Sequence, residues 1–199
     1  MIAAMTTLLL GLALFLGIHS VRIVADDWRT RFIAQRGAMP WKGVYSVLAI
    51  AGFVLVCVGF GQARQQPVVL WSPPRWTHDL AALLTLVSFI LITAAYVPGN
   101  GIKARTNDPM ILGVKCWAAG HLLANGTLAD VVLFGAFLAW AVLDFRAVRR
   151  RRRAGKEPAI APPRRGRSAI SVVVGVLAWM LFAFHLHLPL IGVQPISWH

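Results

Sequence analysis

The chain has 199 residues, of which 58% are hydrophobic and only 14% are charged, and its mean hydropathy is +0.67. A soluble protein of this size needs a larger polar surface, so the composition excludes a soluble globular domain and indicates an integral membrane protein. The formal net charge of +13 raises the question of nucleic-acid binding, but the excess of cations sits in one short segment. No nucleic-acid partner is therefore expected.

Apolar blocks follow one another along the whole chain, at 8–24, 44–61, 80–97, 109–124, 128–145 and 169–188. Most of them approach the roughly 20 residues that a helix needs to cross the hydrocarbon core of a bilayer. They lack the alternation of a barrel wall, which disfavours strands. We therefore expect an all-α fold, a polytopic transmembrane bundle of about six helices in a single domain over residues 1–199.

The fourth block, 109–124, is the shortest and contains Lys115. A short apolar segment can be tilted or re-entrant instead of crossing the bilayer. In that case the bundle has five crossings, and the side of the N-terminal basic residues changes.

Basic residues set the expected orientation. Ten of the 20 Lys and Arg residues lie between positions 146 and 167, including the consecutive arginines at 149–153. The positive-inside rule places this segment in the cytoplasm, and six crossings then put both termini on the periplasmic side of a bacterial inner membrane. We expect a flexible basic loop at 146–168 that contacts anionic membrane lipid.

Tryptophans fall near several predicted ends of the apolar blocks. An amphipathic indole is stable at the membrane surface, so we interpret these residues as interfacial anchors. They are Trp28, Trp41, Trp71, Trp76 and Trp198.

Four histidines lie in or at the ends of apolar blocks: His19 in the first, His121 in the fourth, and His185 and His187 in the sixth. A neutral imidazole can coordinate haem iron, and two of them on different helices can hold a macrocycle in an apolar setting. The alternative is that each histidine only hydrogen-bonds a neighbouring helix. The residues alone leave both interpretations open.

The fourth block places Trp117 and His121 on one helical face, with Gly113 and Gly120 beside it. Such small residues admit either a flat ring or a neighbouring helix close to the backbone. Asn125 stands one turn after His121. It either fixes the tautomer of that histidine or simply ends the helix.

Nine motifs are spread over nearly the whole chain: HSVR at 19–22, WKGVYS at 41–46, GFGQAR at 59–64, WSPP at 71–74, AYVPGN at 95–100, PMILGVK at 109–115, HLLANG at 121–126, FLAWAVLD at 137–144 and HLPLIGV at 187–193. In these motifs the chain resembles the NnrU family of bacterial inner-membrane proteins.

The resemblance implies a link to denitrification, the reduction of nitrite and nitric oxide. The family is also similar to 15-cis-zeta-carotene isomerases, which bind haem b through histidines, and His19 and His121 match those positions. One expectation is thus a haem b protein with redox or isomerase-like activity on a hydrophobic molecule such as a polyene or quinone. The other is a non-enzymatic membrane factor that supports the denitrification reductases, with their components as partners.

Two features complicate this assignment. Many relatives have His-Pro where this chain has Asp108-Pro109. In addition, the six-crossing topology puts His19 and His121 toward opposite membrane surfaces, with an offset of roughly 10 Å at the rise of a helix. His185 and His187 match His121 better in depth, and they are kept as rival ligands.

Overall fold

The computed structural model describes residues 2–195, and all regular elements in this range are helices, apart from one isolated antiparallel bridge between Val69 and Thr127. The all-α fold is therefore confirmed. Contacts divide the chain into two compact units. The first unit runs through Leu70 and adds Thr127–Val148, and the second consists of Trp71–Gly126 and the residues from Arg149 onward.

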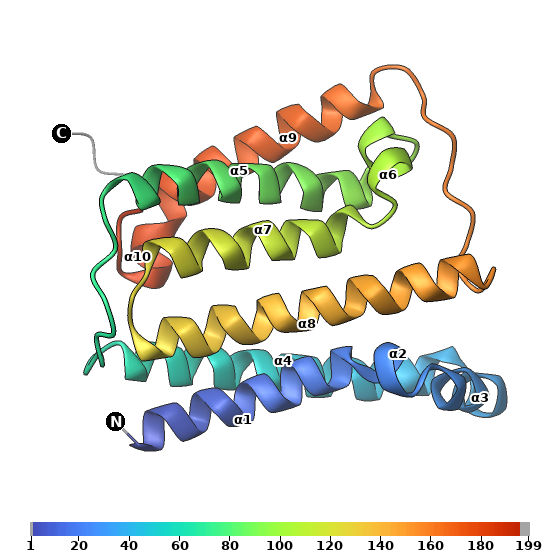
Figure 1. Cartoon of the computed structure of the whole chain (residues 1–199). Helices are drawn as coiled ribbons and strands as arrows, with labels where there is room; N and C mark the ends of the chain where they lie inside the picture. The colour runs from blue at the N-terminus through green and yellow to red at the C-terminus, as the bar shows by residue number, and fades with distance from the viewer. Residues whose placement is uncertain (1, 196–199) are drawn as a thin grey trace. The chain divides into compact units, whose positions relative to one another are not determined.

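The first unit contains two long helices that lie side by side, α1 and α4, joined by two shorter ones (Figure 1). Its helices are α1 (Ile2–His19), α2 (Val21–Val24), α3 (Asp26–Arg36), α4 (Ala38–Ala63) and the part of α8 (Leu128–Arg153) that ends at Val148. Asp26 and Asp27 begin α3 and Arg36 ends it, an order that suits the helix dipole.

Helices α1 and α4 approach each other closely at three glycines, Gly11, Gly52 and Gly59, which we call the glycine seam. A Cβ atom on Gly52 would lie 2.6 Å from the backbone nitrogen of Phe15, and one on Gly11 would lie 2.5 Å from that of Val56. A Cβ atom on Gly59 would overlap the backbone of Leu8. Only glycine permits such direct contact between backbones, as is common where helices pack inside a bilayer.

The second unit is arranged around α5, against which α7 and α9 both pack (Figure 1). Its helices are α5 (Trp76–Tyr96), α6 (Gly101–Thr106), α7 (Pro109–Ala124), α9 (Arg167–Leu181), the π-helix η1 (Phe182–Leu186) and α10 (His187–Ile191). Gly113 and Gly120 of α7 meet Ile92 and Leu84 of α5. The close approach that these glycines permit is thus made by a neighbouring helix.

Five helices within residues 2–195 are long and apolar enough to cross a membrane: Ile2–His19, Ala38–Ala63, Trp76–Tyr96, Leu128–Arg153 and Arg167–Ile191. The fourth apolar block forms the shorter helix α7 of 16 residues. Large apolar side chains remain uncovered on these helices; Val47, for example, is 66% exposed and Ile50 is 64% exposed. Such surfaces suit contact with lipid tails.

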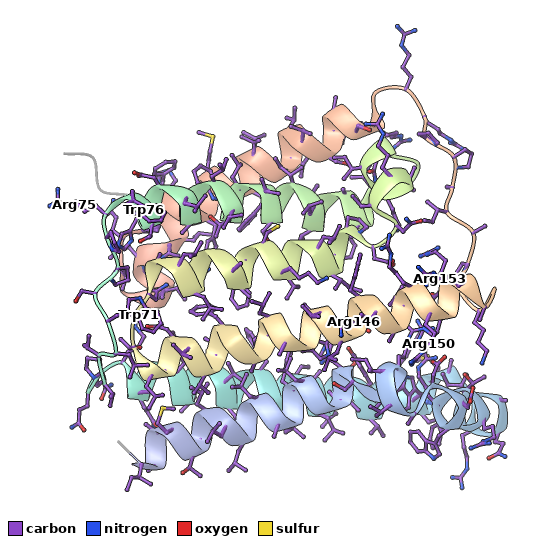
Figure 2. All side chains as sticks on the ribbon, in the orientation of Figure 1. Trp71, Arg75, Trp76, Arg146, Arg150 and Arg153 are labelled. Carbon is purple, nitrogen blue, oxygen red and sulfur yellow. The ribbon has the colours of Figure 1, made fainter. Side chains whose placement is uncertain are left out.

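The basic segment 146–168 begins as helix, because α8 continues to Arg153. Arginine is a good helix former, and its charge is favourable in a last turn, which explains this extension beyond the apolar block. A hydrogen bond holds the segment that follows α8 at Arg164: the backbone N–H of Arg164 donates to the carbonyl of Gly99 at 2.8 Å. Within the second unit, Arg150 and Arg153 lie at the end opposite Trp71 and Trp76 (Figure 2).

Replacing Gly59 by alanine should lower the free energy of unfolding by about 1–3 kcal/mol, the usual cost of overpacking, because the new methyl would overlap Leu8. The matched control is Gly61→Ala on the same helix, where a Cβ atom meets nothing within 4 Å. Alanine favours helix by roughly 0.5–1 kcal/mol over glycine, so this control should be at least as stable as the unchanged chain. Equal free energies of unfolding for the two variants in detergent would contradict the close backbone contact at the glycine seam.

A reporter fused after Gly155, an exposed turn residue two positions after the end of α8, should report a cytoplasmic location. A second fusion after Gln66, in the connection between α4 and α5, should report the periplasm. Alkaline phosphatase, active only outside the cytoplasm, and a fluorescent protein that matures only inside it make a matched pair. Phosphatase activity at Gly155 would overturn the expected orientation.

Candidate functional site

His19 is the last residue of α1 and is surrounded by aromatic rings of the first unit. Its ring centroid lies 4.2 Å from that of Phe15, 5.1 Å from that of Tyr45 and 6.0 Å from that of Trp140. Its Nδ1 atom lies 2.6 Å from the carbonyl oxygen of Phe15, one turn earlier. The imidazole is therefore held by its own helix within an aromatic environment.

Trp140 of α8 carries a buried indole nitrogen, Nε1, that has no hydrogen-bond partner within residues 2–195. Buried donors in proteins are nearly always paired, and one that is not needs an explanation. This donor belongs to the ring that meets His19 edge to face. An acceptor oxygen on a bound molecule would satisfy it.

His121 lies late in α7, with its ring centroid 5.3 Å from that of Trp117. Its Nδ1 atom lies 2.9 Å from the carbonyl oxygen of Trp117. The amide of Asn125 donates to the backbone carbonyl of His121 at 2.8 Å, and Asn125 is the C-terminal cap of α7. Asn125 thus ends the helix, while the contact that orients the imidazole comes from Trp117.

The same pattern sets the tautomer of three histidines. Besides His19 and His121, His187 places its Nδ1 atom 2.6 Å from the carbonyl oxygen of Val193. A carbonyl can only accept a hydrogen bond, so in each neutral imidazole the proton is on Nδ1. The lone pair is then on Nε2, the nitrogen that can coordinate a metal or accept a proton.

One cavity of about 180 Å³ lies inside the second unit and brings two of the predicted ligands together, His121 and His187. His78, in the first turn of α5, lines it as well. His185 is exposed and is not among the lining residues, and His19 belongs to the first unit. Much of the remaining wall is aromatic, formed by Phe89, Trp117, Trp179 and Phe182.

The π-helix η1 gives His187 its place in this wall. The N–H of His187 donates to the carbonyl of Phe182, five residues earlier, and the two rings meet edge to face with centroids 5.7 Å apart. A regular α-helix puts residues four apart on one face, whereas this wide turn aligns residues five apart. Phe182, Ala183 and His187 all line the cavity as a result.

Two polar contributions to the cavity were not predicted from the sequence. His78 lies before the apolar block at 80–97, so hydropathy gave no reason to include it in a helix. Trp179 of α9 donates its indole N–H to the hydroxyl of Thr85 in α5 at 3.0 Å. A tryptophan in the middle of an apolar block is the signal that points to such a buried partner.

The described residues contain no group of three or more His, Cys, Asp or Glu side chains that could hold a bare metal ion. Haem iron has different needs, because the macrocycle supplies four nitrogens and the protein adds only one or two axial ligands. Single imidazoles with Nε2 as the acceptor meet that requirement.

A family model described as NnrU protein matches residues 7–195. The chain belongs to the NnrU family. The match includes both compact units, His19 and His121, so the NnrU resemblance of the sequence motifs is confirmed. The comparisons with curated proteins and with solved structures gave no match.

Thr85→Val should destabilise this NnrU protein by about 1–3 kcal/mol, because it removes the acceptor of the Trp179 indole while keeping the side-chain shape. Thr93→Val is the matched control on α5, since the Thr93 hydroxyl donates to the carbonyl of Phe89 in its own helix. Unfolding in detergent measures both. Adding Trp179→Phe to Thr85→Val should recover part of the loss, and full additivity of the two changes would contradict the coupling.

Proposed function

We propose that this NnrU protein binds haem b in the bacterial inner membrane and uses it on a hydrophobic molecule, in support of nitrite and nitric oxide reduction. The observation that carries the proposal is His121, whose tautomer is fixed by Trp117 and which lines an apolar, aromatic cavity together with His78 and His187. The family resemblance supports the link to denitrification and the choice of haem b.

The histidines of the site suit haem iron. The cavity, however, is too small to enclose the whole cofactor. Imidazoles with Nδ1 engaged are suitable axial ligands, and aromatic walls suit a porphyrin. The cavity of about 180 Å³ is smaller than the roughly 300–1,000 Å³ of ordinary ligand pockets. A macrocycle would therefore fill this cavity and extend beyond it.

His121 would hold the haem iron, and the resemblance supports His19 as a second residue that would hold it. Two contacts of the first unit favour a bound group at His19: the backbone carbonyl of Phe15 fixes the tautomer of the imidazole, and the buried indole N–H of Trp140 lacks an acceptor within residues 2–195. A carboxylate of the cofactor or an oxygen of a substrate would provide that acceptor. His187 is the rival second ligand, because it shares the cavity with His121.

Bound haem b would supply electron transfer and Lewis-acid chemistry at its iron. The chain's own side chains would form the walls of the site and hold its helices in place. Phe89 and Phe182 would limit the access of water to the cavity, and the Thr85–Trp179 hydrogen bond holds α5 and α9 at its wall. An apolar, aromatic site suits a polyene or a quinone, so the expected reaction is redox or isomerase-like.

The decisive experiment is an absorption spectrum of the purified protein in detergent, oxidised and reduced, after expression with ample haem. We expect a Soret band and sharp reduced α and β bands. His121→Ala should abolish the six-coordinate spectrum, whereas His185→Ala, at an exposed position, should leave it unchanged. Loss of the spectrum in His19→Ala but not in His187→Ala would assign His19, and the reverse result would assign His187.

A folded but colourless protein would refute the haem proposal. It would favour the second candidate, a non-enzymatic membrane factor whose histidines only tie helices together. The Nδ1 atoms of His19, His121 and His187 each lie within hydrogen-bond distance of a backbone carbonyl. A reductase component could then dock on the basic segment 146–168. A spectrum unchanged by His121→Ala would refute the ligand assignment alone.

A further inference from the structure

A second cavity, of about 370 Å³, lies in the second unit, and charged and amide side chains line part of its otherwise apolar wall. They come from the turn before α6, the start of α7, the last turn of α8 and the segment after it. The residues that define it are Asn100, Lys103, Asp108, Arg152, Glu157 and Ile160. Figure 1 shows α6 and the chain leading to α9 at the same end of this unit. We call this space the α6 cavity.

The walls of the α6 cavity are rigidly built. Asn100 is fully buried, donates to the carbonyl of Ala94 at 2.8 Å and accepts from the N–H of Lys103 at 2.8 Å. The ammonium group of Lys103 donates to the carbonyl of Ala95 at 2.9 Å. These bonds join the end of α5 to the start of α6 and fix Lys103 at the cavity.

The ion pairs of the α6 cavity leave an excess of positive charge. Glu157 is paired with Arg151 at 2.6 Å, and both side chains are more than nine-tenths buried. Asp108 is paired with Arg152 by one contact, 3.3 Å between Oδ1 and Nη2. Lys103 is the third cation against two carboxylates, and an anionic group would balance its charge.

Two residues that line the α6 cavity each carry a buried atom without a hydrogen-bond partner within residues 2–195. These atoms are Nε of Arg152, which is a donor, and Oδ2 of Asp108, which is an acceptor. A ligand that satisfies both must therefore carry an acceptor for the guanidinium and a donor for the carboxylate. A simple anion meets only the first need.

We propose that the α6 cavity binds a phosphate diester that carries a hydroxyl or amine donor a few atoms from the phosphorus. The phosphate oxygens would accept from Arg152 Nε and Lys103, which are strong charge-assisted partners. The hydroxyl or amine would donate to Asp108 Oδ2. The headgroups of phosphatidylglycerol and phosphatidylethanolamine have this chemistry, and the cavity volume lies within the roughly 300–1,000 Å³ of ligand sites.

The location supports a lipid headgroup. The α6 cavity lies beside the last turn of α8, where the apolar block at 128–145 has ended and the run of arginines at 149–153 closes the helix. The positive-inside rule places this end at the cytoplasmic membrane surface. The proposal is independent of haem binding, because the α6 cavity shares no lining residue with the cavity at His121.

The test uses delipidated full-length protein in detergent, to which phosphatidylglycerol, phosphatidylethanolamine or phosphatidylcholine of identical chains is added. Native mass spectrometry measures bound lipid. Phosphatidylcholine has a quaternary ammonium without an N–H donor, so it should bind about tenfold more weakly, the factor expected for one charge-assisted hydrogen bond. Equal binding of all three lipids would overturn the proposal.

Variants locate the site. Arg152→Lys keeps the charge but removes Nε, and it should lower binding of phosphatidylglycerol about tenfold. Asp108→Asn should reduce the discrimination against phosphatidylcholine. Arg153→Gln, at an exposed neighbouring position, is the matched control and should change neither. A loss in Arg153→Gln with none in Arg152→Lys would show adsorption on a basic surface, which depends on charge alone, and would refute the site.

Competition with free glycerophosphoglycerol, a soluble phosphate diester that carries hydroxyl donors, separates a lipid headgroup from a soluble ester as the ligand. Displacement of the lipid only at large excess of the free ester supports a lipid headgroup as the ligand. Displacement at concentrations equal to that of the lipid instead supports a soluble phosphate ester in the same site. If Asp108→Asn fails to fold, Arg152→Lys and the lipid series still decide the outcome.

Discussion

Direct contact between helix backbones at glycines is the interaction on which the rest of this fold depends. Inside a bilayer, lipid tails are as apolar as leucine, so helices associate through close packing instead of through the hydrophobic effect. Gly11, Gly52 and Gly59 provide that contact between α1 and α4, and Gly113 and Gly120 provide it between α7 and α5. Apolar side chains elsewhere on the helices are then left for lipid.

The candidate sites are built directly on these contacts. Gly52 meets the backbone of Phe15, and the carbonyl of the same Phe15 holds the imidazole of His19. Gly120 packs on Ala81 and Leu84, and its neighbour in the chain, His121, shares a cavity with Ala81. The positions of both histidines are therefore fixed by backbone packing, not by flexible side chains.

The sequence predicted the long apolar helices, because hydropathy averaged over about twenty residues depends little on tertiary structure. The motifs, not hydropathy, indicated the family. The sequence did not decide whether a flat cofactor ring or a neighbouring helix packs against Gly113 and Gly120, since both require small residues at these positions. The sequence did not predict the π-helix at 182–186 or the unpaired indole N–H of Trp140, because both arise from tertiary packing. Trp41, predicted as an interfacial anchor, is only 8% exposed and packs against Trp28 and Phe32, while Trp198 lies outside the described residues.

The two compact units are interleaved along the chain, which has a consequence for biosynthesis. The first unit needs α8 as well as α1 and α4, yet the ribosome makes α5, α6 and α7 before α8. Helices α1 and α4 must therefore remain in the membrane without their α8 neighbour until most of the second unit has been inserted. Truncation before residue 128 would leave neither unit whole, so a nascent chain arrested there should be a substrate for membrane quality control.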